Sequence, residues 1–176
     1  MKLRKSYRIP FGFLIGFMYV WRADPSLVYF LIGAAFMVFG ECLRFMSAGT
    51  LIKFEGVTRN GIYAYTRNPL YIGSFFIGTG ACIIGRDPIF TILFLFLFPL
   101  VYSGVIRREE NYLTKRYGED YLRYLREVPR ILPKHLKLRE ILRETSPFLA
   151  VKNREYLTVS GIVFLWIFMI VRMYFL

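Results

Sequence analysis

The chain has 176 residues, a length typical of one domain, and is 56% hydrophobic and 19% aromatic with a net charge of +12. A water-soluble domain of this size cannot bury so much apolar surface, so the composition excludes an ordinary soluble fold. Apolar and basic segments alternate along the whole chain. The charge therefore indicates membrane-flanking segments rather than a nucleic-acid surface. One histidine and two cysteines inside apolar runs predict no metal site.

Apolar segments predict an all-α, polytopic membrane protein of about five transmembrane helices, in a single domain covering 1–176. The segments are 9–21, 25–45, 69–85, 88–106 and 156–176. A span needs about 20 residues, or about 17 at the short end, so the third segment is borderline. The first is shorter still and crosses only with local thinning, or is re-entrant. Arg44 and Arg172 lie near segment ends, where a long side chain can reach the interface.

The distribution of charge predicts the orientation. Nearly all Lys and Arg residues lie in the N-terminal segment, in the loop after the second apolar segment, and in 107–154. The positive-inside rule places these three regions, and the cofactor site derived below, on the cytoplasmic side. The basic stretch 134–155, in which leucines alternate with charges, is expected to lie as a helix on anionic lipid.

A first polar motif covers residues 61–73, where the third apolar segment begins. Asn68 precedes a proline, which keeps it out of helical geometry, so it is expected to be the N-cap with Pro69 at the first helical position. Arg67 and Tyr71 lie within one turn of that cap, and helix starts favour anions. Taken alone, the motif is more typical of an interfacial aromatic belt on a well-capped helix.

Small residues follow inside this segment. Ser74, Gly78 and Cys82 form one stripe at a spacing of four, and Gly73 and Gly80 lie on a neighbouring face. Such stripes usually mean close helix packing. The 78–80 triplet alternatively admits a ligand, although a single GxG is weak evidence.

A second polar motif covers residues 107–133. Glu109 and Glu110 lie just past the fourth segment, at a depth where a carboxylate is costly unless it is paired or functional. The simplest interpretation is an ion-paired helix in which Glu109 bonds Arg108 or Arg116.

Together the two motifs resemble the isoprenylcysteine carboxyl methyltransferase and phospholipid methyltransferase superfamily. The family's Arg-His-Pro-x-Tyr-x-Gly box matches 67–73, and its Glu-Glu-x-x-Leu box, which ends in Val-Pro, matches 109–129 without a gap. The resemblance covers roughly 56–133, and Asn68 stands where many members have histidine. An amide caps and donates but does not titrate, so a role that needs imidazole is in doubt here.

The resemblance implies a pocket for S-adenosylmethionine, closed by the segment after the fourth span. Its expected lining is Tyr65, Asn68, Pro69, Tyr71, Gly73, Gly78, Gly80, Glu109, Glu110, Tyr117 and Tyr121. A glutamate suits the cofactor's ammonium, Arg67 its carboxylate, and tyrosines its adenine or sulfonium. Arg67, Arg130 and Glu110 are the expected catalytic residues: an arginine orients a carboxylate acceptor, or a carboxylate acts as base for an amine acceptor.

The function expected from the sequence is methyl transfer to a lipid or lipid-modified acceptor that enters from the bilayer. Two alternatives stay open. One is a sterol-type membrane reductase that uses NADPH, although the acidic pair would repel a pyrophosphate. The other is a non-enzymatic scaffold, with aromatic residues as belt and basic residues as lipid anchors.

Overall fold

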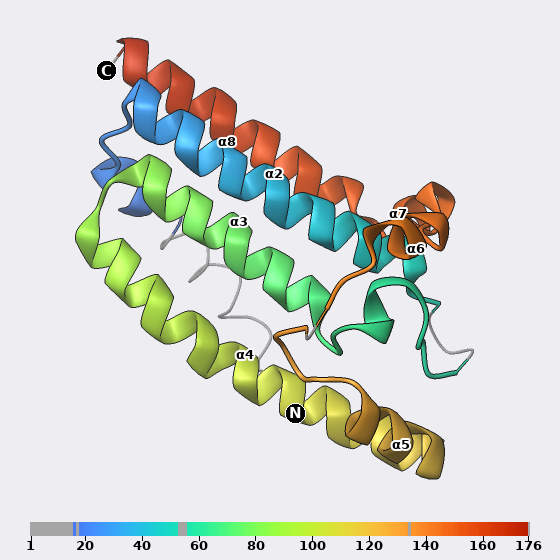
Figure 1. The fold of residues 1–176 in the computed structure, drawn as a ribbon. Helices are drawn as coiled ribbons and strands as arrows, with labels where there is room; N and C mark the ends of the chain where they lie inside the picture. The colour runs from blue at the N-terminus through green and yellow to red at the C-terminus, as the bar shows by residue number, and fades with distance from the viewer. Residues whose placement is uncertain (1–15, 17, 53–55, 134, 176) are drawn as a thin grey trace.

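In a computed structural model, residues 16, 18–52, 56–133 and 135–175 are described, and they form an all-α protein without a strand. Residues 18–22 are helical. The helices that follow are labelled as in Figure 1: α2 Leu27–Thr50, the 3-10 helix η2 Gly61–Ala64, α3 Pro69–Gly85, α4 Pro88–Tyr117, α5 Glu119–Glu127, α6 Leu138–Arg143, α7 Pro147–Lys152 and α8 Tyr156–Phe175.

Three helices, α2, α4 and α8, are long and apolar enough to cross a membrane, and α3 is a shorter apolar helix of 17 residues. The all-α polytopic class is therefore confirmed. The count of five spans stays a prediction, because the first apolar segment, 9–21, falls largely outside the described residues. Helix α4 continues through Pro99 to Tyr117. At 1.5 Å per residue it is about 45 Å long and extends beyond the hydrocarbon layer of a bilayer.

The long helices lie side by side in the order α8, α2, α3, α4, as Figure 1 shows. Helices α2 and α3 approach each other at glycines. A Cβ added at Gly40 would lie 2.5 Å from the carbonyl oxygen of Gly73, and the reverse is equally true. Gly33 and Gly80 form a second reciprocal pair. This confirms the packing interpretation for Gly73 and Gly80, since only glycine allows backbones so close.

Capping residues set where the helices begin. The Asp87 carboxylate accepts from the backbone N–H groups of Ile89 and Phe90, at 2.8 and 3.1 Å, and starts α4. Asn68 is the N-cap of α3 with Pro69 at the first position, as predicted, but its side chain makes no capping bond. The Asn68 amide instead donates to the carbonyl of Arg130, 3.0 Å away. The cap residue therefore ties α3 to a segment 62 residues later in the chain.

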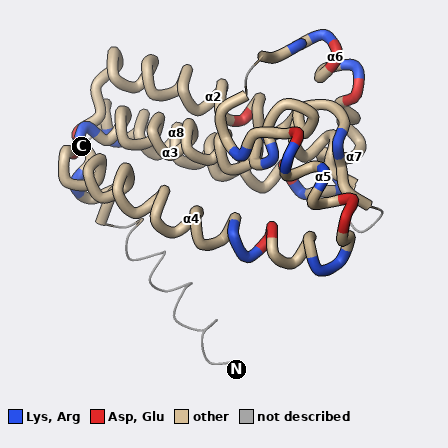
Figure 2. Tube along the Cα trace, turned by 60° about the horizontal axis from the view of Figure 1, so that its bottom comes forward, with Lys and Arg blue, Asp and Glu red and all other residues tan. Residues whose placement is uncertain are grey.

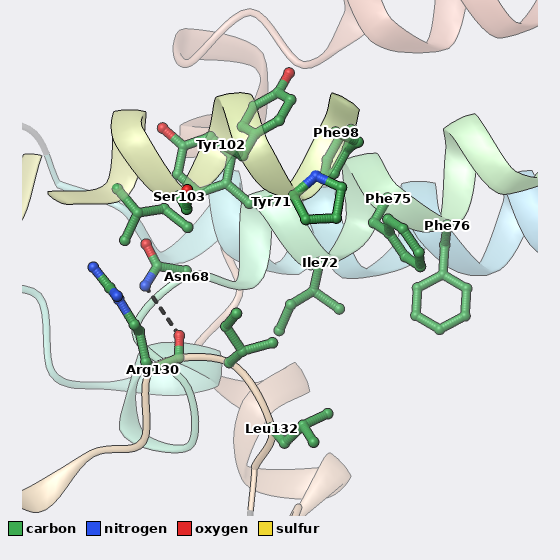
Figure 3. A pocket seen from close by; sticks show the side chains of 13 residues that line it. Asn68, Tyr71, Ile72, Phe75, Phe76, Phe98, Tyr102, Ser103, Arg130 and Leu132 are labelled. Atoms are coloured by element: carbon green, nitrogen blue, oxygen red, sulfur yellow. Dashed lines mark hydrogen bonds between the residues drawn. The ribbon is translucent and has the colours of Figure 1, made fainter. Parts of the chain in front are cut away.

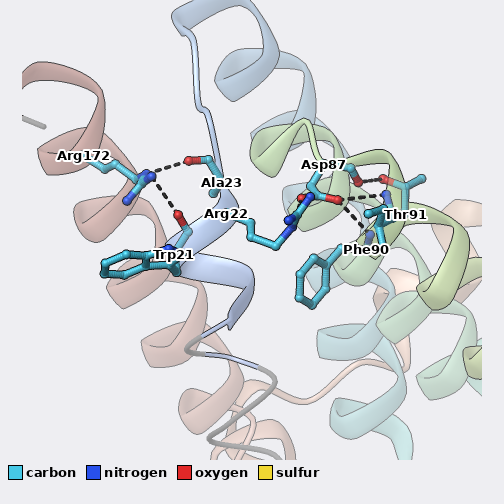
Figure 4. Close-up of polar contacts among 8 residues, drawn as sticks. Trp21, Arg22, Ala23, Asp87, Phe90, Thr91 and Arg172 are labelled. Carbon is cyan, nitrogen blue, oxygen red and sulfur yellow. Dashed lines mark hydrogen bonds and ion pairs between the residues drawn. The ribbon is translucent and has the colours of Figure 1, made fainter.

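Polar contacts close the end of the bundle where α8 finishes (Figure 4). Arg172 donates to the carbonyl oxygens of Ala23 and Trp21 at 2.6 and 3.0 Å, and Arg22 pairs with Asp87 at 2.5 Å. The position of Arg172 near a segment end lets its side chain reach the interface, and there it bonds backbone carbonyls of the chain segment that precedes α2.

The basic stretch after α5 also differs from the prediction. It forms two short helices, α6 and α7, rather than one helix. Ser146 caps α7, and the backbone N–H of Ser146 donates to the carbonyl of Gly49 at 2.8 Å, which docks the stretch on the end of α2. Pro147 favours the break, since the residue before a proline avoids helical geometry.

Candidate functional site

A cavity of about 470 Å³, here called the polar cavity, lies where the charged half of α4 faces the start of α3. Polar side chains reach it from five regions of the chain. These are Arg44, Tyr63, Arg67, Asn68, Tyr71, Glu109, Glu110, Tyr112, Tyr121, Asn153 and Glu155. Figure 2 shows that most charged residues gather at this end of the molecule.

Two arginines flank one carboxylate at the cavity. Arg67 Nη1 lies 3.3 Å from Glu110 Oε1, and Arg130 Nη2 lies 2.6 Å from Glu110 Oε2. The side chains of Arg67 and Glu110 are 14% and 16% exposed. The Nε atoms of both arginines and Oε1 of Glu110 are buried and make no hydrogen bond within the described residues. Buried charged groups normally satisfy their bonding capacity, so these unsatisfied atoms distinguish the cluster from an ordinary structural ion pair.

The neighbouring carboxylate has a different partner. Glu109 Oε1 accepts from the Tyr71 hydroxyl at 2.7 Å, and the Tyr71 ring lies 5.1 Å from that of Tyr102. The expected pairing of Glu109 with Arg108 or Arg116 is therefore wrong. The turn of α4 that carries Glu109 faces α3, and this brings the carboxylate to the Tyr71 hydroxyl.

Arg44 forms the deep wall of the polar cavity. It donates to Glu155 at 2.6 Å, to Ser74 at 2.6 Å and to Thr158 at 3.1 Å, which joins α2, α3 and α8. Arg44 therefore bonds within the helix bundle, a role that its place near a segment end does not indicate. Glu155 is 5% exposed and supplies the opposite charge inside the bundle.

Tyrosines from α4 and α5 form a smaller pocket of about 210 Å³ beside the polar cavity, and we call it the tyrosine pocket. Its lining includes Tyr63, Arg67, Tyr112, Tyr117, Tyr121 and Tyr124. Burial, together with the nearby charge of Glu110, raises the pKa of Tyr121 to about 12. Burial also raises the pKa of Tyr124, whose hydroxyl donates to the carbonyl of Tyr63 at 2.9 Å. Both phenols stay neutral near pH 7, so the pocket offers flat, uncharged rings.

A third space, of about 420 Å³, lies between α3 and α4, and we call it the apolar groove (Figure 3). Its walls are Ile72, Phe75 and Phe76 of α3, Phe98, Tyr102, Ser103 and Ile106 of α4, and Ile131 and Leu132. Asn68, Tyr71 and Arg130 are at its polar end, and the first two also line the polar cavity. The groove and the polar cavity therefore meet at Asn68 and Tyr71.

The predicted site residues divide into two groups. The polar cavity and its rim bring together Arg67, Asn68, Pro69, Tyr71, Glu109, Glu110, Tyr121 and Arg130, with Tyr117 in the adjoining tyrosine pocket. Four residues lie elsewhere. Gly73 and Gly80 face α2, Gly78 faces the ring of Phe94, and the Tyr65 hydroxyl donates to Glu140 at 2.9 Å.

Several residues that line the polar cavity and the apolar groove were not predicted from the sequence. Arg44 and Glu155 are 111 positions apart, and no local pattern connects them. The groove had a readable signal, because Phe94, Phe98 and Tyr102 recur every four residues and so share one face of α4. Aromatic residues at helical spacing are common in membrane helices, so that signal alone did not indicate a groove.

Comparison with known proteins places these features in a family. Residues 26–120 match the phospholipid methyltransferase family. Three similar proteins are each named protein-S-isoprenylcysteine O-methyltransferase. The one from Schizosaccharomyces pombe is 28% identical over 75% of this chain and 58% of its own length. The one from Dictyostelium discoideum is 33% identical over 65% and 54%, and the human one is 31% identical over 57% and 40%.

This chain therefore spans about half the length of the curated relatives it matches. No solved structure matches it. The family match begins before α2, runs through α3 and α4, and contains the first polar motif and the first part of the second, up to residue 120. With the helical membrane architecture and the paired cavities, it leads to one assignment: the chain belongs to the phospholipid methyltransferase family.

Proposed function

We propose that this protein is a membrane methyltransferase that uses S-adenosylmethionine to methylate a lipid-modified acceptor. The single observation that carries the proposal is the junction of the polar cavity with the apolar groove at Asn68 and Tyr71. A reaction between a water-soluble cofactor and a lipid needs two such spaces that meet at one point. Positioning the reactants there supplies most of the catalysis.

The polar cavity fits the cofactor in charge. The charged residues that line it are Arg44, Arg67, Glu109, Glu110 and Glu155, and Arg130 pairs with Glu110 at the rim. With Arg130 included the charges balance, as suits a ligand whose amino-acid end carries both an ammonium and a carboxylate. Glu109 is the partner we assign to the ammonium, because its only hydrogen bond within the described residues is from a neutral phenol. Arg67 Nε, which is buried without a hydrogen bond, is assigned to the carboxylate.

The remaining parts of the cofactor have partners nearby. The tyrosine pocket shares Tyr63, Arg67 and Tyr121 with the polar cavity, so a ligand can extend into both. Its neutral rings suit an adenine. When bound, S-adenosylmethionine supplies a methyl group on a sulfonium sulfur. Tyr71 lies at the junction, where its electron-rich ring would stabilise that positive charge.

The acceptor we propose is a carboxylate on an isoprenoid-modified cysteine, as the names of the three relatives suggest. Arg130 is the charged residue at the polar end of the groove, and a guanidinium there holds a carboxylate and repels an ammonium. A carboxylate acceptor is already ionised and needs no base. This removes the doubt raised by Asn68, because no step then requires an imidazole.

Titration of the detergent-purified protein with S-adenosylhomocysteine, beside NADPH, tests the cofactor. We expect saturable binding of S-adenosylhomocysteine alone. Glu110→Gln leaves two arginines without their shared carboxylate and should weaken binding by about thirtyfold or more, since truncating one member of a buried charge pair costs about 2–5 kcal/mol. Glu119→Gln removes the same charge from the exposed start of α5 and should bind normally.

Methyl transfer from labelled cofactor tests the acceptor. A farnesylated cysteine with a free carboxylate should accept methyl groups, whereas its methyl ester and phosphatidylethanolamine should not. Labelling of phosphatidylethanolamine alone would show that the acceptor is an amine and not a carboxylate. In the cofactor titration, binding of NADPH alone would favour a reductase over a methyltransferase. Binding of neither cofactor by folded protein would favour a non-enzymatic scaffold.

A further inference from the structure

The segment from residue 129 to residue 154, here called the strap, exposes apolar side chains in a regular pattern. In α6, Leu138 and Leu142 are 60% and 55% exposed, while Ile141 is 2% exposed. In α7, Phe148 and Val151 are 73% and 60% exposed, while an alanine between them is buried. Both helices thus turn one apolar residue toward the protein and two away from it. The outward residues lie one turn apart, as in helices that lie in a membrane interface.

Basic residues flank these apolar stripes. Arg139 and Arg143 are one turn apart beside the two leucines, and Lys152 and Arg154 follow in and after α7. All four are exposed, and none has a carboxylate partner among the residues that the structure describes.

The acidic residues of this region are occupied by the protein itself. Glu140 accepts from Tyr65 and Lys137, at 2.9 and 3.0 Å, and Glu144 accepts from the backbone N–H of Gly61 at 2.5 Å. These contacts anchor α6 on η2, and Lys137 offsets the charge of Glu140. Basic residues outnumber the two glutamates in the strap, so its net charge is positive.

The same strap builds one wall of the apolar groove. Three consecutive backbone carbonyls of the strap accept hydrogen bonds. The carbonyl of Pro129 accepts from the backbone N–H of Arg67 at 3.0 Å, that of Arg130 from the Asn68 side-chain amide at 3.0 Å, and that of Ile131 from the Thr66 hydroxyl at 2.7 Å. Beyond this anchor, Leu132 lines the groove and is 81% exposed. The strap thus joins a basic, apolar outer face to the polar end of the groove.

The strap lies at the membrane boundary of two spanning helices. The Asn153 amide donates to the carbonyls of Ala48 and Leu51, both at 2.9 Å, at the end of α2, and α8 begins at Tyr156. Figure 2 shows the basic residues of α6 on the outside of this end. Apolar side chains that project from this level meet the interfacial layer of the bilayer in which α2 and α8 are embedded.

We propose that the strap binds the headgroups of anionic phospholipids in the surrounding bilayer, and that this contact holds the groove wall in its working position. Arg139, Arg143, Lys152 and Arg154 bind the headgroups, and the leucines, Phe148 and Val151 insert beside them. Methyl transfer, on which this regulation rests, is then faster in an anionic bilayer than in a neutral one. Juxtamembrane basic residues gain affinity for anionic lipid additively, so four of them form an effective site.

The test compares the full chain in nanodiscs of phosphatidylcholine with nanodiscs that contain about 30% phosphatidylglycerol, a composition that gives a strongly negative surface. Hydrogen exchange of residues 138–152 reports the contact, and methyl transfer to the farnesylated cysteine reports its consequence. We expect anionic discs to slow exchange by about tenfold and to raise transfer severalfold, with both effects fading at high salt. Arg139→Gln combined with Arg143→Gln should remove both effects.

A matched variant controls for charge alone. Arg123→Gln combined with Arg126→Gln removes two exposed positive charges from α5, where the neighbouring leucines are half-buried, and should respond to anionic lipid as the parent does. Thermal unfolding of both double variants checks that they fold.

Each outcome has one meaning. Equal exchange in the two kinds of disc overturns the lipid site. Slower exchange in anionic discs with unchanged transfer rates overturns the regulation. Slower exchange with no transfer in either disc supports the lipid site and counts against the proposed enzyme instead. Equal protection in neutral discs by dissolved inositol hexakisphosphate would overturn the assignment of the site to a bilayer.

Discussion

Helix α3 has two faces that pack in opposite ways. Against α2 it presents glycines, so that backbone meets backbone at the Gly40 and Gly73 pair. Against α4 it presents aromatic rings: Phe75 lies 5.7 Å from Phe94, Tyr71 lies 5.1 Å from Tyr102, and the apolar groove of about 420 Å³ opens among them. The α2–α3 interface, here called the tight seam, leaves no room for a side chain. The α3–α4 interface, here called the loose seam, keeps a space that side chains do not fill.

One face of α3 thus fixes the position of the helix, and the other face forms the proposed binding groove. The tight seam fixes the position of α3 relative to α2, since two backbones in contact cannot slide without a clash. The loose seam then holds a groove whose width depends on side chains alone. Substitutions at the two seams should therefore fail in different ways.

The largest effect is expected at the tight seam. Gly40→Leu inserts a side chain where even a Cβ would lie 2.5 Å from a carbonyl oxygen, and a backbone neighbour cannot yield. Overpacking typically costs about 1–3 kcal/mol where side chains can adjust, so we expect a larger loss here and little folded protein. Thermal unfolding and gel filtration in detergent measure it. Gly161→Leu on α8, where an added Cβ meets nothing within 4 Å, should fold normally.

The next effect separates the two arginines that share Glu110. Arg67→Gln should weaken S-adenosylhomocysteine binding by at least about tenfold, because a charge-assisted bond contributes about 1.5–3 kcal/mol. Arg130→Gln should instead lower kcat/KM for a carboxylate acceptor by a similar factor and leave cofactor affinity nearly unchanged. Calorimetry and steady-state kinetics on both variants measure the split. If Arg130→Gln impaired only cofactor binding, Arg130 would belong to the cofactor site.

A smaller effect is expected from filling the loose seam. Ser103→Trp places a large ring in the groove without touching the glycine seam. We expect KM for a farnesylated acceptor to rise by about tenfold, because the ring would displace the equivalent of one or two methylene groups of the acceptor chain from the groove. The affinity for S-adenosylhomocysteine should not change. A series of acceptors with shorter chains sharpens the test, because the penalty should shrink with chain length. A penalty independent of chain length would place the lipid elsewhere.

The smallest effect is expected at the junction. Tyr71→Phe removes the hydroxyl that donates to Glu109 at 2.7 Å, and a single hydrogen bond contributes about 1 kcal/mol, so cofactor affinity should change by about fivefold. Tyr102→Phe is the matched control, because the Tyr102 hydroxyl makes no hydrogen bond among the described residues. Equal behaviour of the two variants would remove the Tyr71 hydroxyl from the site.

The sequence predicted the features that depend on local chemistry. Apolar runs located α2, α3, α4 and α8, and a proline after Asn68 located the start of α3. The two polar motifs identified most of the charged cavity lining, because one hydrophobic hairpin brings them together. Features that depend on distant partners were missed. Arg44 and Glu155 meet only after α8 packs on α2, and no spacing rule connects them.

The glycines show a different limit of sequence reasoning. Gly73 and Gly80 were expected beside a cofactor and are instead in contact with α2. A glycine indicates that something comes close, and a ligand and a helix backbone require the same absence of a side chain. The sequence of α3 alone cannot distinguish them, whereas the facing Gly33 and Gly40 of α2 were the signal that could have done so.

The contacts of Arg172 have a consequence for how the chain is made. Helix α8 leaves the ribosome after every other described helix, yet its Arg172 donates to the carbonyls of Trp21 and Ala23, which were synthesised first. The turn before α2 therefore obtains these donors only when the late helix has entered the bilayer and packed. Until then the two carbonyls of the turn lack the donors that they have in the finished structure. The hydrogen bonds of Arg172 are therefore contacts that only the full set of described helices can form.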